Sequence, residues 1–189
     1  MRRLSNVLVF LGIATLALIF APVLKEETIY RVHQIVKTQA DLTPPNKDFS
    51  IVIPKIDAVS PIIANVDTSD PKNYLPALKR GVAHAAGTSL PDEEGNVYLF
   101  AHSTDTFYNA SYYNAVFYLI GKLNDGDQIS IFYKGKEIKY EVYDKKVVSP
   151  DSSQYFGKIG DGKTLTLQTC YPPGTTLKRL VVLAREISD

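Results

Sequence analysis

The apolar residues divide the chain into one long apolar segment at the N-terminus and a larger region of short apolar runs separated by turn residues. After Phe49, these runs predict strands over 50–53, 60–63, 97–101, 128–133, 137–145, 164–169 and 180–185. The glycine turn at 134–136 indicates a hairpin, and apolar residues near a 3.6 period predict a helix over 112–123. Short strands with one or two helices indicate a mainly β fold, a closed or nearly closed β-barrel.

The N-terminal segment has the features of a membrane anchor. Arg2 and Arg3 precede an uncharged stretch over 4–24, whose most apolar part, 7–24, would span about 27 Å as a helix. A cleaved signal peptide is the alternative, but its apolar region is usually shorter and ends in an Ala-x-Ala-like site, which is absent here. By the positive-inside rule, we expect a single-pass transmembrane helix within 1–24, with the N-terminus in the cytoplasm.

A connecting segment follows this anchor. Apolar positions at helical spacing between 25 and 40 predict a juxtamembrane helix, and Pro44 and Pro45 mark a linker that ends at residue 48. We therefore expect the globular domain to occupy 49–189, outside the membrane.

Composition narrows the classes of function. The chain has 189 residues with 21 Lys and Arg against 20 Asp and Glu, so it lacks the basic surface that nucleic-acid binding requires. Its single cysteine excludes an internal disulfide and a Cys-rich metal site. The 45% of hydrophobic residues is typical of a folded globular protein.

Three side chains are candidates for chemistry. Cys170 ends the run 164–169 just before a Pro-Pro-Gly loop, which would hold a nucleophilic thiol rigidly yet open to solvent. His102 ends the run 97–101, where an imidazole could move protons near neutral pH. Arg179 begins the last strand and could donate hydrogen bonds to an oxyanion. The alternatives are a buried cysteine, a surface histidine and a solvated arginine.

The segment Thr164-Leu-Thr-Leu-Gln-Thr-Cys170, followed by Lys178-Arg-Leu-Val-Val182, resembles the signature of the sortases, which are membrane-anchored cysteine transpeptidases. Gly81-Val-Ala-His84 and Gly95-Asn-Val-Tyr-Leu-Phe-Ala-His102 resemble the family's paired histidine segments. The resemblance covers about 49–187 and implies a sortase-type eight-stranded barrel. It implies that Cys170 is the nucleophile, His102 the general acid and base, and Arg179 the group that binds substrate and stabilises the oxyanion. His84 would not be catalytic. Ala101 departs from the family, which commonly has glycine there.

The resemblance also implies a reaction. The enzyme would cleave an LPxTG-like sorting signal of a surface protein between Thr and Gly, form a thioester, and transfer the protein to an amine of the cell envelope or of a pilin-like subunit. The loops 149–162 and 171–178 are expected to line the substrate groove. The candidate substrate-contacting residues are Thr169, Tyr171, Ala101, Ser103, Tyr155 and Phe156.

No cofactor is required by this reaction. Some sortases use Ca²⁺ to order the loop equivalent to 149–162, and Asp151, Asp161 and the acidic cluster Asp92-Glu-Glu94 could bind a hard cation. Such residues are more typical of solvated turns.

Other classes fit the sequence less well. L,D-transpeptidases place a histidine shortly before the cysteine, and papain-like proteases place the cysteine at a helix start and before the histidine; neither pattern occurs here. The remaining alternative is a membrane-tethered β-barrel that binds envelope partners without catalysis, with Cys170 as a buried structural residue.

Overall fold

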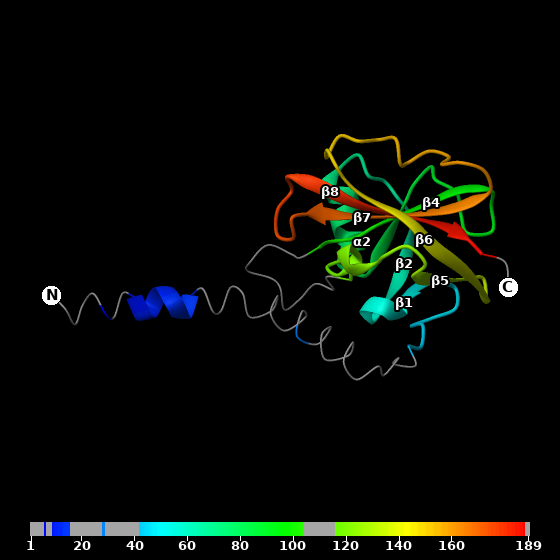
Figure 1. Cartoon of the computed structure of the whole chain (residues 1–189). Helices are drawn as coiled ribbons and strands as arrows, with labels where there is room; N and C mark the ends of the chain where they lie inside the picture. The colour runs from blue at the N-terminus through cyan, green and yellow to red at the C-terminus, as the bar shows by residue number, and fades with distance from the viewer. Residues whose placement is uncertain (1–5, 7–8, 16–27, 29–41, 104–115, 188–189) are drawn as a thin grey trace.

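The computed structural model describes residues 6, 9–15, 28, 42–103 and 116–187. Within them, eight strands close into a barrel in the order β1-β2-β3-β4-β7-β8-β6-β5 (Figure 1). The strands are β1 (Phe49–Ile53), β2 (Ala58–Val66), β3 (Val82–Ala85), β4 (Gly95–Phe100), β5 (Gln128–Tyr133), β6 (Lys136–Val148), β7 (Lys163–Tyr171) and β8 (Lys178–Glu186). Strands β2 and β3 pair in parallel, as do β4 and β7, and the other neighbours are antiparallel. Each predicted strand is present, and β3 is an addition.

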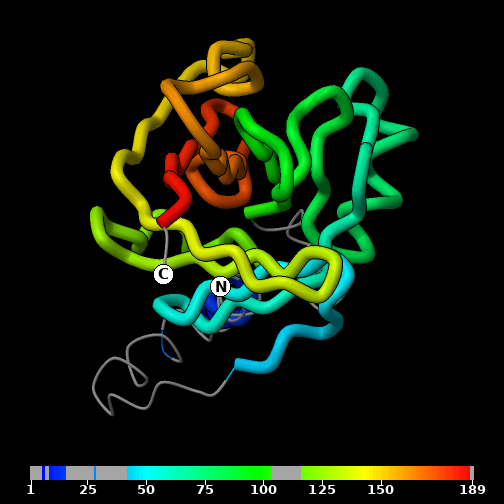
Figure 2. Tube along the Cα trace, turned by 90° about the vertical axis from the view of Figure 1, so that its right-hand side faces the viewer, coloured from blue at the N-terminus to red at the C-terminus, as the bar shows by residue number. Residues whose placement is uncertain are grey.

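Alternation along the strands gives the barrel two distinct faces. Leu99, Leu167 and Val182 point into the closed interior, where they belong to the main hydrophobic core. On the outer face, Tyr98 and Val181 belong to a second cluster, which the β6–β7 connection covers with Tyr155. Figure 2 shows β7 and β8, in orange and red, on the side of the barrel opposite the cyan β1 and β2. Successive side chains along β4, β7 and β8 therefore alternate between the core inside the barrel and the cluster on its outer face.

Short helices connect the strands: η1 (Pro54–Ile56), α2 (Pro71–Leu78) and η2 (Ile120–Lys122). Helix α2 begins where the Asp70 carboxylate accepts a hydrogen bond of 2.8 Å from the Lys72 N–H, and Pro71 supplies the first helical residue. Tyr74 of this helix meets Phe100 edge-on, with ring centroids 6.2 Å apart. Helix α2 thus covers the outer face of the sheet near the end of β4.

The predicted helix over 112–123 is wrong in its described part. Residues 116–119 form turns and lead into the 3-10 helix η2, while 112–115 lie outside the described residues. Phe117, Ile120 and Leu123 are fully buried in the core at intervals of three residues. That interval matches the three residues per turn of a 3-10 helix better than the period of an α-helix.

Most of the predicted anchor lies outside the described residues. Within the anchor, residues 9–15 are described and are helical. Among the residues that the structure describes, no helix is both long enough and apolar enough to span a bilayer. The predicted juxtamembrane helix over 25–40 also falls outside them, apart from Thr28. Residues 42–48 form neither helix nor strand, and β1 starts at Phe49.

One core side chain offers a test of the packing. Tyr140 is fully buried, and its hydroxyl has no hydrogen-bond partner among the described residues. An unpaired buried hydroxyl costs about 1–3 kcal/mol. We expect Tyr140→Phe to raise the free energy of unfolding by about 1 kcal/mol, measured by urea denaturation of the full chain in a mild detergent. Tyr98→Phe is the control and should lower stability, because the Tyr98 hydroxyl donates to Gln168. A Tyr140→Phe protein that unfolds at lower urea than the wild type would contradict the prediction.

Candidate active site

The pairing of three neighbouring strands aligns the three candidate residues. Cys170 of β7 lies directly opposite Arg179 of β8 in the antiparallel register. Strands β4 and β7 are parallel, and Phe100 lies beside Gln168. The Ala101 N–H continues this pairing with a hydrogen bond of 3.2 Å to the Gln168 carbonyl. His102, two residues after Phe100, is therefore at the level of Cys170.

All three side chains lie on the outer face of the sheet. Leu167, Ala101 and Leu180 point into the core, and each precedes or follows a candidate position by an odd number of residues. Because side chains alternate along a strand, the positions of Cys170, His102 and Arg179 face outward. Neighbouring strands are about 4.8 Å apart, so the three positions lie side by side on one surface.

The exposure of Cys170 suits a nucleophile, and the hydrogen bonds of Arg179 suit a fixed cation. Cys170 is a free cysteine of intermediate exposure, which disagrees with the alternative of a buried structural cysteine. The Arg179 Nη1 donates hydrogen bonds of 3.1 Å to the Thr176 and Lys178 carbonyls. These bonds orient the guanidinium over the connection that leaves β7 just after Cys170.

His84 has the environment of a buried structural residue, not of a catalytic one. It pairs with Leu99 on the inner side of the sheet, and its ring lies against Phe49 with centroids 5.9 Å apart. Its Nδ1 accepts a hydrogen bond of 3.2 Å from the Asn65 N–H, and its Nε2 lies 3.1 Å from the Ser89 carbonyl, to which it can donate. Both ring nitrogens of a neutral imidazole are thereby paired, on the face of the sheet away from Cys170.

The burial of His84 predicts how the stability of the fold depends on pH. Burial lowers the pKa of His84 below its ordinary 6.5, although its bond to Ser89 opposes the shift. Below pH 6.5, the unfolded chain therefore binds more protons at this histidine than the folded chain does. The contribution of His84 to the free energy of unfolding is fully present above that pH and decreases as the pH falls toward the folded-state pKa. Urea denaturation at about pH 7.5 and about pH 5 should show this loss, and a smaller one in His84→Gln. An equal loss in the variant would mean that other groups cause it.

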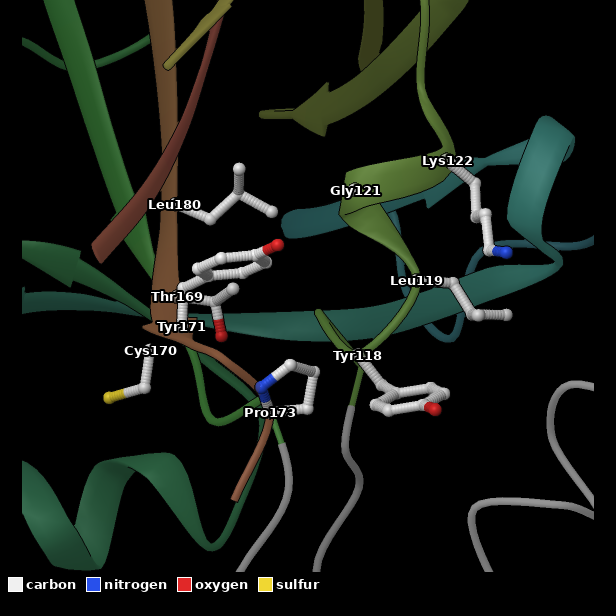
Figure 3. Close-up of a pocket in the computed structure, with 9 residues that line it drawn as sticks. All are labelled: Tyr118, Leu119, Gly121, Lys122, Thr169, Cys170, Tyr171, Pro173 and Leu180. Atoms are coloured by element: carbon white, nitrogen blue, oxygen red, sulfur yellow. The ribbon is translucent and has the colours of Figure 1, made fainter. Parts of the chain in front are cut away.

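A pocket of about 310 Å³ lies at the barrel rim beside Cys170. In Figure 3, Tyr171 and Pro173 form one side, Tyr118 and Leu119 form the other, and the Cys170 sulfur points away from that second side. The full lining is Tyr118, Leu119, Gly121, Lys122, Thr169, Cys170, Tyr171, Pro173 and Leu180. The apolar spacing over 112–123 predicts a regular helix, and no feature of it marks 118–122 as a wall of this pocket.

The residues predicted to contact substrate fall into different places. Tyr171 is exposed at the pocket. The Thr169 hydroxyl is buried and donates a hydrogen bond of 2.9 Å to the Ala101 carbonyl, which ties β7 to the segment before His102. Ser103 is buried, and its hydroxyl has no partner among the described residues. We conclude that Thr169 and Ala101 support the site from inside the barrel, whereas Tyr171 faces the solvent.

Tyr155 and Phe156 lie on the outer face. The Tyr155 carbonyl accepts a hydrogen bond of 2.7 Å from the Asn96 side chain, and Phe156 stacks on Tyr98 with ring centroids 4.0 Å apart. Both residues therefore fix the β6–β7 connection against β4, on the side of the sheet that carries Cys170.

Three of the acidic residues considered for Ca²⁺ have other partners. Asp92 pairs with Lys134 at 2.8 Å, and this hydrogen bond lowers the pKa of the Asp92 carboxyl. Asp161 lies 4.0 Å from the Lys158 ammonium, and Glu93 accepts a hydrogen bond from the Leu90 N–H. Across 42–103 and 116–187, no three His, Cys, Asp or Glu side chains are grouped to hold a metal ion.

Comparisons with known proteins identify the family of the chain. The Sortase domain family model matches residues 51–187. Sortase D of Bacillus subtilis (strain 168) is 29% identical over 157 residues, which cover 80% of this chain and 71% of that protein. The structure of sortase C-1 from Actinomyces oris has a TM-score of 0.63 at 29% identity, covering 89% of this chain and 86% of that one. A Clostridium perfringens sortase D5 transpeptidase gives 0.60 at 25% identity, covering 86% and 89%. The chain therefore belongs to the sortase family of cysteine transpeptidases.

Proposed function

We propose that this sortase cleaves an LPxTG-like sorting signal between Thr and Gly and transfers the acyl part to an amine. One observation carries the proposal: Cys170 and Arg179 lie opposite each other across β7 and β8, and His102 lies at the same level beside β7 on the same outer face. A nucleophile, a proton carrier and a fixed cation within reach of one peptide bond are what acyl transfer needs.

In the first step, the Cys170 thiolate attacks the carbonyl carbon of the Thr–Gly bond. The carbonyl oxygen becomes an oxyanion, and Arg179 donates hydrogen bonds to it from its planar guanidinium. The hydrogen bonds of Arg179 to Thr176 and Lys178 support this role, because they hold the cation in place before the substrate arrives.

The tetrahedral intermediate then loses its amine. The carbon–nitrogen bond breaks, the departing Gly nitrogen takes a proton from His102, and the acyl group remains as a thioester on Cys170. An incoming amine attacks the thioester, His102 takes a proton from that amine, and the Cys170 thiolate leaves. The net change is the exchange of one amide for another, with no oxidant, reductant or metal.

The proposed substrates are surface proteins with a sorting signal near the C-terminus, and the proposed acceptor is an amine of the cell envelope or of a pilin-like subunit. The apolar segment over 4–24 would anchor the chain in the cell membrane, with its N-terminus in the cytoplasm and the barrel outside. A membrane-anchored enzyme would meet exported substrates as they leave the membrane.

The test is product analysis. The full chain in mild detergent is incubated with a panel of peptides that carry different pentapeptide motifs and with a short glycine peptide as amine acceptor. Mass spectrometry should find cleavage between Thr and Gly and a new amide to the acceptor. No cleavage of any peptide, together with a Cys170 that is inert to small methanethiosulfonates, would favour the non-catalytic binding module.

A further inference from the structure

Gln168 lies next to the proposed catalytic residues without a role in the steps above. It precedes Cys170 by two residues on β7, so both side chains leave the same outer face about 7 Å apart. Across the sheet, Gln168 lies between Phe100 of β4 and Val181 of β8. Its side chain is half-buried, which leaves it accessible to a ligand on that face.

The hydroxyl of Tyr98 fixes the orientation of the Gln168 amide. It donates a hydrogen bond of 2.5 Å to the Gln168 Oε1. Tyr98 itself is fully buried under the stacked ring of Phe156. Burial raises the pKa of Tyr98, and the nearby charge of Arg179 opposes that rise, so the phenol remains a donor and lies close to the arginine. With its oxygen occupied, the amide presents its nitrogen as the free end.

That nitrogen carries two N–H donors, and no described residue accepts a hydrogen bond from it. A neutral, oriented donor pair suits a neutral acceptor, and the main-chain carbonyl is the acceptor that a peptide presents. In an extended peptide, carbonyls of residues two apart point the same way, about 7 Å from each other. This repeat matches the offset between Cys170 and Gln168 along β7.

The direction along β7 selects the side of the scissile bond. Beyond Cys170 the chain enters the β7–β8 connection, whereas Gln168 lies toward the β6–β7 connection, which Phe156 and the Asn96–Tyr155 hydrogen bond fix to the same face. A peptide whose acyl part extends toward the β6–β7 connection brings the carbonyl two residues before the Thr over Gln168.

We propose that Gln168 is a substrate-binding residue whose amide N–H donates to the main-chain carbonyl two residues before the Thr, which is the Pro carbonyl of an LPxTG-like signal, and that Tyr98 is a positioning residue for this amide. The inference rests on the proposed function, because it assigns a contact to the same substrate. It adds a contact that orients the peptide along β7, which the nucleophile, the proton carrier and the oxyanion donor do not provide.

The test compares thioester formation in variants of the full chain. Gln168→Leu should lower kcat/KM about tenfold through KM, with kcat little changed, as expected for one lost hydrogen bond in binding. Gln128→Leu is the matched control and should behave as the wild type, because Gln128 is exposed at the start of β5. Alkylation of Cys170 by iodoacetamide should proceed equally in all variants, which separates substrate binding from damage to the site.

Two further measurements identify the contact. Tyr98→Phe should lower kcat/KM about threefold in the wild-type background and not at all in Gln168→Leu, which a merely structural role of Tyr98 would not produce. An ester in place of the Pro–x amide weakens the Pro carbonyl as an acceptor, so it should slow the wild type and leave Gln168→Leu unaffected.

The outcomes separate this inference from the function on which it rests. Wild-type kcat/KM in Gln168→Leu, or an equal effect of the ester in both proteins, would overturn the role of Gln168 and leave the transpeptidase proposal standing. If the wild type forms no thioester with any peptide while iodoacetamide still modifies Cys170, the proposed function and the contact both fail.

Discussion

Replacing Cys170 by alanine is expected to abolish thioester formation and to slow peptide cleavage about 10⁴-fold or more. Without Sγ, the site loses the thiol that accepts the acyl part in the proposed steps. The fold should persist, because Cys170 contributes to β7 chiefly through backbone pairing with Arg179, and its side chain lies on the outer face rather than in the core. Mass spectrometry of the enzyme after incubation with peptide measures the adduct directly.

Circular dichroism and urea denaturation supply the control for this variant. The unfolding midpoint of Cys170→Ala should stay close to that of the wild type, which shows that the lost activity belongs to the sulfur. A Cys170→Ala protein that still cleaves the peptide at a substantial rate would mean that another group is the nucleophile.

Arg179→Lys is expected to lower kcat/KM for thioester formation about 10²–10³-fold, the effect of losing an oxyanion donor. The guanidinium uses Nη1 for the Thr176 and Lys178 carbonyls and still has further N–H groups for the substrate. An ammonium is a compact charge without this planar fork, so it cannot hold the loop and the oxyanion in the same geometry. Stopped-flow or quenched reactions with one peptide provide the rates.

Arg185→Lys is the matched control, since Arg185 is exposed, lies six residues further along β8, and has its Nη2 3.5 Å from the Glu141 carboxylate. This variant should react at the wild-type rate. If Arg179→Lys also reacted at that rate, the guanidinium would have no part in stabilising the oxyanion.

Much of the barrel could be predicted because its strands carry local signals. Alternating apolar residues marked 128–133 with the bounds that β5 has, and the hairpin to β6 follows from a turn in which Lys134 and Gly135 both have positive φ, at 49° and 81°. Glycine adopts that conformation freely, which is why the turn is visible in the sequence. His102 and Cys170 could be predicted as candidates for a related reason, since each directly follows a segment with the pattern of a strand.

Other features depend on contacts that no local pattern encodes. Strand β3 has four residues, Val82–Ala85, two of them alanine and one of them β-branched, so it lacks the run of β-branched residues and the alternation that identify longer strands. The turns over 116–119 follow from core packing of Phe117 and Ile120, and the Lys145 ammonium binds the Gly121 carbonyl at 2.6 Å. Tyr98 and Gln168 are separated by 70 residues, and only the parallel register of β4 and β7 brings them together.

The proposed reaction requires a covalent intermediate on one sulfur, and this intermediate can be located. The full chain is incubated with an LPxTG-like peptide, quenched in acid, digested and analysed by tandem mass spectrometry. We predict a mass increase on Cys170 alone, equal to the mass of the acyl part of the peptide that ends at Thr. This adduct should disappear when an amine is added, as the amide product forms. Cleavage of the peptide with no adduct on Cys170, or with the adduct on another residue, would contradict the assignment.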